Sequence, residues 1–262
     1  MEKKKFLTIS LSQEEVFVVL AHMGMRQMLG IDGGIFQSLT KEQVELAFTV
    51  AERALIARGF LKPGEDAKLQ IDPVVLSIFA TCTVPDTSLI ITRSEPEMAA
   101  IAFFFHLTKQ LQVGHTSPAS GIHQFTVYAE KTAVSNIIHN ILQLDSQEKL
   151  PCPSGELAET AVTQARDAAV DSGMEGALAV LQQTDLADET QKQFAQTLSS
   201  PKANTTFVHI NHKIDKDNQA DGFTVLEGIN GLWILKPASG DDVSLQPVSA
   251  AEAEQLFQAL NE

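Results

Sequence analysis

The sequence has few cysteines and no long apolar run. Cys82 and Cys152 are its two cysteines and form no CxxC pair, so we interpret them as buried apolar side chains or a surface thiol. No segment approaches the ~20 apolar residues of a membrane span. The basic N-terminal stretch is interrupted by Thr8, Ser10 and Ser12, which does not suit the apolar core of a signal peptide. We therefore expect a cytoplasmic protein that has no membrane partner.

Positive charge is also scarce. The chain has 19 Lys and Arg residues against 33 Asp and Glu residues, which gives a formal net charge of -14. An acidic chain repels phosphate backbones, so we expect no nucleic-acid partner. With 262 residues, 44% of them hydrophobic, the chain can bury a sizeable core as one large domain or two small ones.

The short motifs of common enzymes are missing. The sequence contains no G-x-S-x-G elbow, Walker loop, H-E-x-x-H motif or Rossmann fingerprint. His209 and His212 are three residues apart, so on a strand they face opposite sides and do not easily share a metal. His106, His115 and His123 could converge across a hairpin, but we favour exposed sheet histidines. We expect no enzyme, no metal and no cofactor.

The pattern of apolar and capping residues indicates helices mixed with strands. Ser12 and Glu15 have the spacing of a capping box at the start of one helix. Thr40 precedes the longest amphipathic pattern of the first half, and Asp72 before Pro73 marks a third helix start. Alternating segments such as TSLIITR and AIAFFFHL predict strands. These features predict an α+β fold.

Two segments share one strand-to-helix pattern, FTVYAEKTAVSNIIHNIL at 125–142 and VSLQPVSAAEAEQLFQAL at 243–260. They are offset by 118 residues, and an offset of 116 pairs Pro85 with Pro201. The identities are few, so chance is an alternative, but the order of elements also repeats. We predict a pseudo-two-fold internal repeat with a central antiparallel β-sheet and helical bundles.

The predicted repeats divide the chain near its middle. The segment DSQEKLPCPSGE combines polar residues with prolines and a glycine, as a domain boundary does. We place the boundary near Pro151–Gly155, so that residues 1–262 form one domain made of repeats at about 1–147 and 148–262.

Two apolar strands are candidates for binding a partner. In AIAFFFHL, Phe104 and His106 share one strand face. In GLWILKP, Leu232 and Ile234 lie on the face opposite Trp233. We favour a core position for Trp233 over an interface anchor. An apolar strand face that is not covered by helices would be a binding surface.

The chain resembles the EspG family of type VII (ESX) secretion-associated chaperones. The segments that carry the resemblance are FLTISLSQEEVFVVLAHMGM, AERALIARGFL, LQIDPVVLSIFATCTVPDTSLIITR and LWILKPASGDDVSLQPVSAAEAEQLFQAL. The resemblance implies a single EspG-like domain with a pseudo-two-fold α+β fold. It also implies a cytosolic protein that binds the helical tip of a secreted, helix-rich substrate and keeps it soluble.

The leading hypothesis is therefore a non-catalytic cytosolic adaptor that covers an apolar surface of a helical partner. Its candidate partner-binding residues are Phe104, His106, Leu232 and Ile234. One alternative is a self-associating structural module that forms a homodimer. A second alternative is a small-ligand enzyme, which would need sheet histidines to converge with a carboxylate in a deep pocket.

Overall fold

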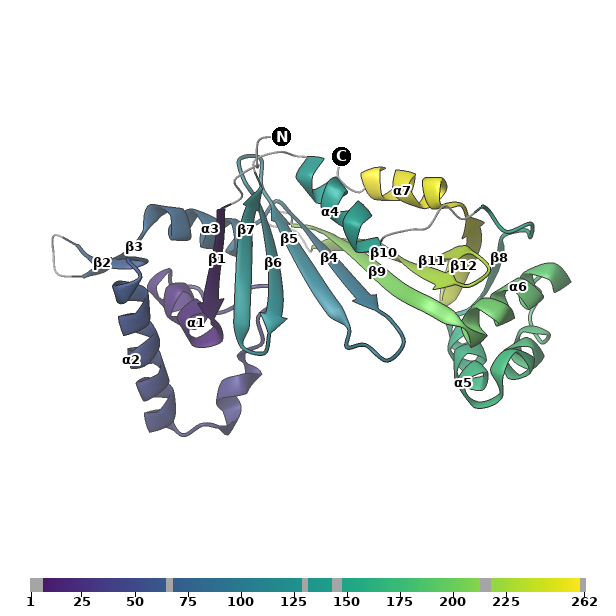
Figure 1. The fold of residues 1–262 in the computed structure, drawn as a ribbon, viewed down its shortest axis with the longest axis horizontal. Helices are drawn as coiled ribbons and strands as arrows, with labels where there is room; N and C mark the ends of the chain where they lie inside the picture. Colours follow the sequence, from purple (N-terminus) through teal and green to yellow (C-terminus); the bar gives the residue numbers. More distant parts are fainter. Residues whose placement is uncertain (1–6, 65–67, 129–131, 143–147, 213–217, 260–262) are drawn as a thin grey trace. The chain divides into compact units, whose positions relative to one another are not determined.

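A computed structural model describes residues 7–64, 68–128, 132–142, 148–212 and 218–259 (Figure 1). The helices are α1 (Gln13–His22), the 3-10 helix η1 (Gly33–Ser38), α2 (Lys41–Ala57), α3 (Pro73–Thr83), α4 (Thr132–Leu142), α5 (Glu159–Leu181), α6 (Asp188–Ser199) and α7 (Ala250–Ala259). The strands of the first half are β1 (Leu7–Ser12), β2 (Leu61–Pro63), β3 (Leu69–Ile71), β4 (Thr87–Ser94), β5 (Ile101–Leu107), β6 (Gln112–Ala119) and β7 (Ile122–Tyr128). The later strands are β8 (Gly155–Ala158), β9 (Pro201–Asn211), β10 (Gln219–Gly228), β11 (Leu232–Pro237) and β12 (Asp242–Val248).

The large antiparallel sheet has ten strands in the hydrogen-bonded order β1-β7-β6-β5-β4-β9-β10-β11-β12-β8. Outward from β4 the order is β5, β6, β7, β1, and outward from β9 it is β10, β11, β12, β8. Each half of the chain thus builds its strands in the same sequence and closes with a helix, α4 or α7. The α+β class and the central antiparallel sheet are confirmed.

The chain falls into two compact units that interleave along the sequence. Unit 1 comprises residues 1–89, 103–131 and 210–219, and unit 2 comprises 90–102, 132–209 and 220–262. This division is different from that of the two predicted repeats. The single domain and its boundary near Pro151–Gly155 stay predictions. Among the described residues, no helix is long and apolar enough to cross a membrane.

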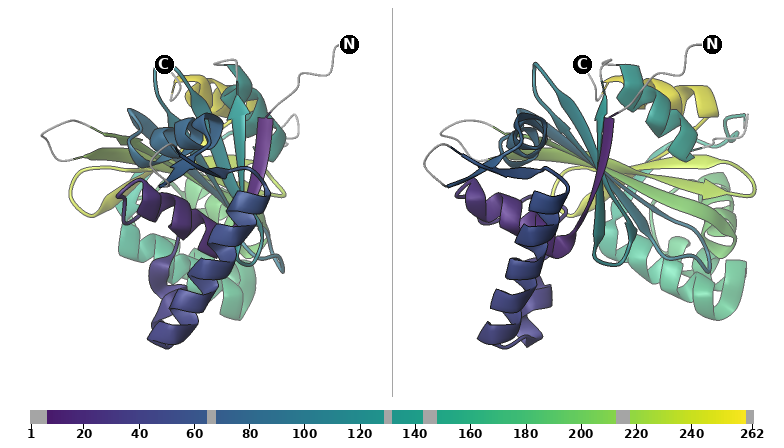
Figure 2. Two further views of the ribbon diagram at one scale, coloured as in Figure 1. Left: turned by 90° about the vertical axis from the view of Figure 1, so that its left-hand side faces the viewer. Right: turned by 60° about the vertical axis from the view of Figure 1, so that its left-hand side comes forward.

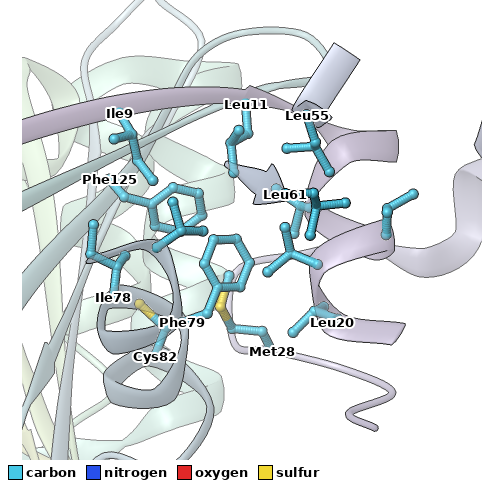
Figure 3. Packing of buried hydrophobic residues seen from close by; sticks show 14 of the residues in the cluster. Ile9, Leu11, Leu20, Met28, Leu55, Leu61, Ile78, Phe79, Cys82 and Phe125 are labelled. Atoms are coloured by element: carbon cyan, nitrogen blue, oxygen red, sulfur yellow. The ribbon is translucent and has the colours of Figure 1, made fainter. Parts of the chain in front are cut away.

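In unit 1, α1 and α2 pack side by side, and α3 packs against β6 (Figure 2). The centre of its core is the pair Phe79 of α3 and Phe125 of β7, whose rings lie 5.2 Å apart (Figure 3). Leu11 of β1, Leu20 of α1 and Leu55 of α2 are buried in the same cluster. One face of β1, β6 and β7 is therefore covered by helices.

The helix starts predicted from the sequence are confirmed where the caps are local. The backbone N–H of Glu15 donates to Ser12, and the N–H of Ser12 donates to the Glu15 carboxylate. Thr40 caps α2, and Asp72 caps α3 with Pro73 as its first residue. These bonds satisfy orphan N–H groups at the helix ends, so they require no tertiary contact.

In unit 2, helices lie on both sides of β10, β11 and β12 (Figure 1). Trp233 of β11 is fully buried in a cluster with residues of α5 and α6, among them Phe194. Pairing of α4 with α7 is supported by a 2.8 Å contact between His139 Nδ1 and a Glu254 carboxylate oxygen. The prediction of a core position for Trp233 is confirmed.

The structure also corrects several local predictions. The segment KPGEDAKLQ at 62–70 has the glycine and proline of a turn, but β2 and β3 occupy its two ends. The segment from Gly155 has a helical pattern, but the strand β8 precedes α5 there. The offset of 116 residues also pairs Asp72 with Asp188, which predicts a second Asp cap. Helix α6 instead begins after Ala187, which provides no side-chain cap, so Asp188 does not cap it. The expected partner of Leu142 in the repeat, Leu260, lies outside the described residues.

We predict that the bond between Trp233 and Thr197 stabilises unit 2. The indole N–H of Trp233 donates to Thr197 Oγ1 at 3.0 Å in a buried setting. Thr197→Val keeps the shape of the side chain but leaves that N–H without an acceptor and removes the bond that the hydroxyl donates to Asn230 Oδ1, so the free energy of unfolding should fall by about 1–3 kcal/mol. Urea unfolding followed by the fluorescence of Trp233, the one tryptophan, measures it.

Thr163→Val is the matched control, because Thr163 is exposed on α5. Its effect should stay within about 0.5 kcal/mol. Equal stability of the two variants would contradict a structural role for the buried bond.

Candidate functional site

The structure separates the four predicted partner-binding residues by exposure. His106, Leu232 and Ile234 are buried, with exposed fractions of 0%, 1% and 0%, whereas Phe104 is half-buried. Neighbouring Trp233 is also buried, so β11 is covered on both faces. Partner binding by these residues stays a prediction, and among the four Phe104 has the accessible surface for direct contact.

Phe104 lies against a loop of unit 1 that runs from residue 23 to residue 32, between α1 and η1. Its ring stacks on the imidazole of His115 with 5.4 Å between centroids. Gly30 of the loop has φ +83° and lies directly on both rings, because a Cβ there would be 2.8 Å from Phe104 and 3.0 Å from His115. The loop therefore packs on aromatic side chains of β5 and β6, and this position requires glycine.

Four histidines of unit 1 are neighbours across the sheet, and we call them the histidine row. His123 Nδ1 and His115 Nε2 are 3.0 Å apart, and the rings of His115 and His106 stack at 6.3 Å. His212, just after β9, follows next to His106, and its Nε2 is 2.9 Å from Ser88 Oγ. The three sheet histidines are buried, so the prediction of exposed sheet histidines was wrong.

Burial keeps the histidine row neutral. It lowers the pKa of His106 to about 4, and the neighbouring His212 acts in the same direction. Burial also lowers the pKa of His115 to about 3, with smaller contributions from His106 and His123, while the backbone of Leu29 acts in the opposite direction. These folded-state values lie below the ordinary 6.5, so their contribution to stability is complete above about pH 6.5 and is lost as the pH falls.

The histidine row has unusual hydrogen-bonding. Within the described part of the chain, neither ring nitrogen of His106 has a partner, and the same holds for His115 Nδ1 and His123 Nε2. No group of three His, Cys, Asp or Glu side chains in these residues is arranged to hold a metal ion. In unit 2, His209 Nδ1 lies 3.0 Å from an Asp221 carboxylate oxygen.

Two hollows flank the C-terminal half of α3 in unit 1. One has a volume of about 440 Å³ and is lined by loop residues 27–31 together with Cys82, Ser88 and His212 among others. The other, of about 640 Å³, is more open and mainly apolar, and we call it the α3 hollow. Its lining includes Met23, Met25, Ala80, Val84 and Leu111.

The α3 hollow was not predicted from the sequence. Its most exposed apolar residue is Val84, at 70%. Val84 ends α3 in a backbone conformation that is not helical, and the methionines follow the end of α1. The sequence does contain a local signal for this hollow, because apolar residues follow the ends of α1 and α3. The two helix ends come close together through the packing of α1 and α3, which the sequence does not indicate.

Unit 2 exposes apolar side chains at a sharp turn in α5. Gly173 has φ 63° and ψ -151°, which divides the helix in two. Next to this turn, Val170 is 82% exposed and Met174 is 39% exposed. The backbone oxygen of Ala168 lies so close to Gly176 that a Cβ there would clash. Small residues thus allow the two halves of α5 to approach closely, which leaves apolar side chains at the tip.

A comparison with solved structures finds a similar fold. The chain matches EspG5, the Mycobacterium tuberculosis type VII secretion system chaperone, which was solved in complex with the PE25-PPE41 dimer. The TM-score is 0.66 with 11% sequence identity, over 97% of this chain and 94% of that one. At this identity the likeness shows an EspG-like fold, as the sequence resemblance implied, and no more.

Two sequence comparisons accompany this match. A family model described as "Uncharacterised protein YfjC" matches residues 8–257, so the chain belongs to the YfjC family. No match was found among the curated proteins.

The orphan nitrogens of His106 lead to a stability prediction. Leucine has a similar volume and loses no hydrogen bond at this position, so His106→Leu should raise the free energy of unfolding by about 1–2 kcal/mol. Urea unfolding at pH 7 followed by circular dichroism measures the change. The control is His139→Leu, since His139 is exposed and pairs with Glu254, which should cost at most about 0.5 kcal/mol. A marked loss of stability in His106→Leu would mean that its ring has a partner.

Proposed function

We propose that this member of the YfjC family is a non-catalytic adaptor that covers an apolar surface of a helical protein partner, as a chaperone does. The observation that carries the proposal is the likeness to EspG5 over 97% of the chain, because that protein is a chaperone solved with a protein dimer. We further propose that the adaptor acts in the cytoplasm and serves a secreted, helix-rich substrate in the manner of type VII secretion chaperones.

The α3 hollow is our proposed binding surface for the partner. Its apolar lining would lose contact with water when an apolar helix end fills it, which is the main favourable term in such association. Methionines such as Met23 and Met25 adapt their shape to different apolar partners, because their side chains are unbranched and flexible. A helix end with leucine or similar side chains would fit this lining.

The partner-binding residues predicted from the sequence have distinct roles in this proposal. Phe104 is half-buried and is not part of the lining of the α3 hollow, so it would contact the partner beside that hollow. His106 lies two residues further along β5 and supports the same face from a buried position. Leu232 and Ile234 hold β11 between its covering layers in unit 2, so their substitution acts on stability before it acts on binding.

The competing proposal is self-association through exposed apolar side chains. Val170 and Met174 at the tip of α5 favour it, because two exposed apolar side chains next to one turn can pair with those of a second copy. Light scattering separates the two functions. A monomer at the concentration at which the partner binds supports the adaptor, and a stable dimer supports the self-associating module.

The adaptor proposal predicts a site-specific loss of binding. Val84→Asp puts a charge at the mouth of the α3 hollow without removing buried packing, since Val84 is 70% exposed. After the partner has been identified by affinity capture from the native host, calorimetry with the purified proteins should show affinity at least about tenfold weaker.

Val170→Asp is the matched control, because Val170 is also exposed and apolar but lies in unit 2. Its affinity for the partner should be unchanged. The reverse result would move the binding surface to the tip of α5. A capture experiment that yields no stoichiometric partner, with a chain that is dimeric in solution, would overturn the adaptor.

A further inference from the structure

The sheet histidines of the histidine row are buried, with several ring nitrogens that have no hydrogen-bond partner among the described residues. His106 is fully buried with two unpartnered ring nitrogens, and His115 and His123 each have one. A buried polar group without a partner has lost its hydrogen bonds to water and regains nothing in the fold. Solvation or protonation of these rings would lower their free energy, and the residues that cover the row oppose both.

Loop residues 23–32 supply much of that cover. Gly30 lies on His115 and Phe104, and the backbone of Leu29 interacts with His115. One loop side chain, Met28, is buried in the core of unit 1 (Figure 3). At the far end of the loop, the Gln13 amide donates to the carbonyl of Asp32. Met23, Met25 and Ile31 of the loop also pack against this core, so the loop is held by the core and by the histidine row.

Asp86 is a neighbour of the row, because the backbone N–H of His212 donates to the Asp86 carbonyl at 3.0 Å. The charge that acts on His106 is that of His212, and the charges that act on His115 are those of His106 and His123. From α3 the facing titratable group is the Cys82 thiol, which burial keeps protonated.

The nearest charged residues of the surrounding loops point elsewhere. Arg26 and Asp32 of the covering loop are exposed, and the Asp32 carboxylate accepts from Gly34 N. Asp86, before β4, is exposed and accepts from the backbone N–H of Lys109. On α1, Glu15 is paired with Arg58 at 3.0 Å. Protons added to the histidine row would therefore repel one another.

We propose that the histidine row is an acid-sensitive latch: protonation of its rings releases loop 23–32 from the sheet while the sheet itself stays folded. In the released state water reaches His106 and His115, the ring of Phe104 loses its cover, and the hollow beside Cys82 opens. The inference rests on the contacts of unit 1. Because Met23 and Met25 belong to loop 23–32 and line the α3 hollow, release of the loop would also alter the proposed binding surface.

The direction of the effect follows from linkage. In the folded state, the pKa of buried His106 is about 4 and that of buried His115 is about 3. When the loop is open, both rings approach the ordinary value of about 6.5, so protons bind the open state more tightly. Lowering the pH from 7.5 to 5.0 should favour opening by about 25-fold for each of the two rings.

Cys82 is a built-in reporter of opening. It is buried, lines the hollow under the loop, and becomes the single thiol in a Cys152→Ser background. The reagent is 4,4′-dithiodipyridine, which reacts with thiols in acid. The measured quantity is the rate at which Cys82 is labelled in the folded chain divided by the rate for the same chain in urea at the same pH. Between pH 7.5 and 5.0 this ratio should rise at least about tenfold.

Two further measurements distinguish a latch from unfolding. Trp233 is buried in unit 2, so its emission should stay unchanged at pH 5.0. Hydrogen exchange, corrected for the intrinsic rates at each pH, should increase for the amides of residues 23–32 and stay constant in β6. If the β6 amides or the Trp233 emission change together with Cys82 labelling, acid unfolds the protein and the latch is overturned.

Substitutions assign the effect to the row. His106→Leu removes one protonation site without removing a hydrogen bond, and it should reduce the acid-induced rise in labelling, by up to about 25-fold relative to the parent. His139→Leu changes an exposed side chain of α4, in unit 2, and should label as the parent does at both pH values. A rise that is the same in all three proteins, or no rise in the parent, would overturn the proposal.

Discussion

The burial of β-strands on both faces is the constraint on which this structure depends. In β11, Leu232, Trp233 and Ile234 are successive residues that point to alternate sides, and all three are buried. Such a strand needs a covering layer on each side, and unit 2 provides helices on both sides of it (Figure 1). The same demand places the Trp233 indole N–H beside Thr197, because a buried donor needs an acceptor.

Unit 1 meets this demand differently, since loop 23–32 shares the covering role with helices. A loop covers a sheet with backbone and a few side chains, so its contacts are fewer than those of a helix. Phe104 remains half-buried and the histidine row carries unpartnered nitrogens in this part of the molecule. In our proposal, buried polar rings under a loop favour a state in which the loop is open. The apolar α3 hollow is the surface that we propose for another protein.

The sequence predicted local features well and faces of strands less well. Capping boxes such as Ser12 with Glu15 form within four residues, so their pattern suffices. The candidate residues Leu232 and Ile234 were correctly placed on one face, but whether a face is covered depends on helices distant in sequence. The sequence allows His106, His115 and His123 either to converge or to be exposed on the sheet. In the structure their rings lie close together and are buried. His212 joins them from the other half of the chain, which no spacing indicates.

By itself the sequence determined the α+β class, the helix starts at Ser12, Thr40 and Asp72, and the core position of Trp233. These follow from periodicity and from hydrogen bonds between near neighbours. Only the tertiary structure decided which apolar surface stays open, which rings lose water, and that the ends of α1 and α3 border one hollow. Such features depend on contacts between residues far apart in the chain, and solvent access is a property of the packed molecule and of no single segment.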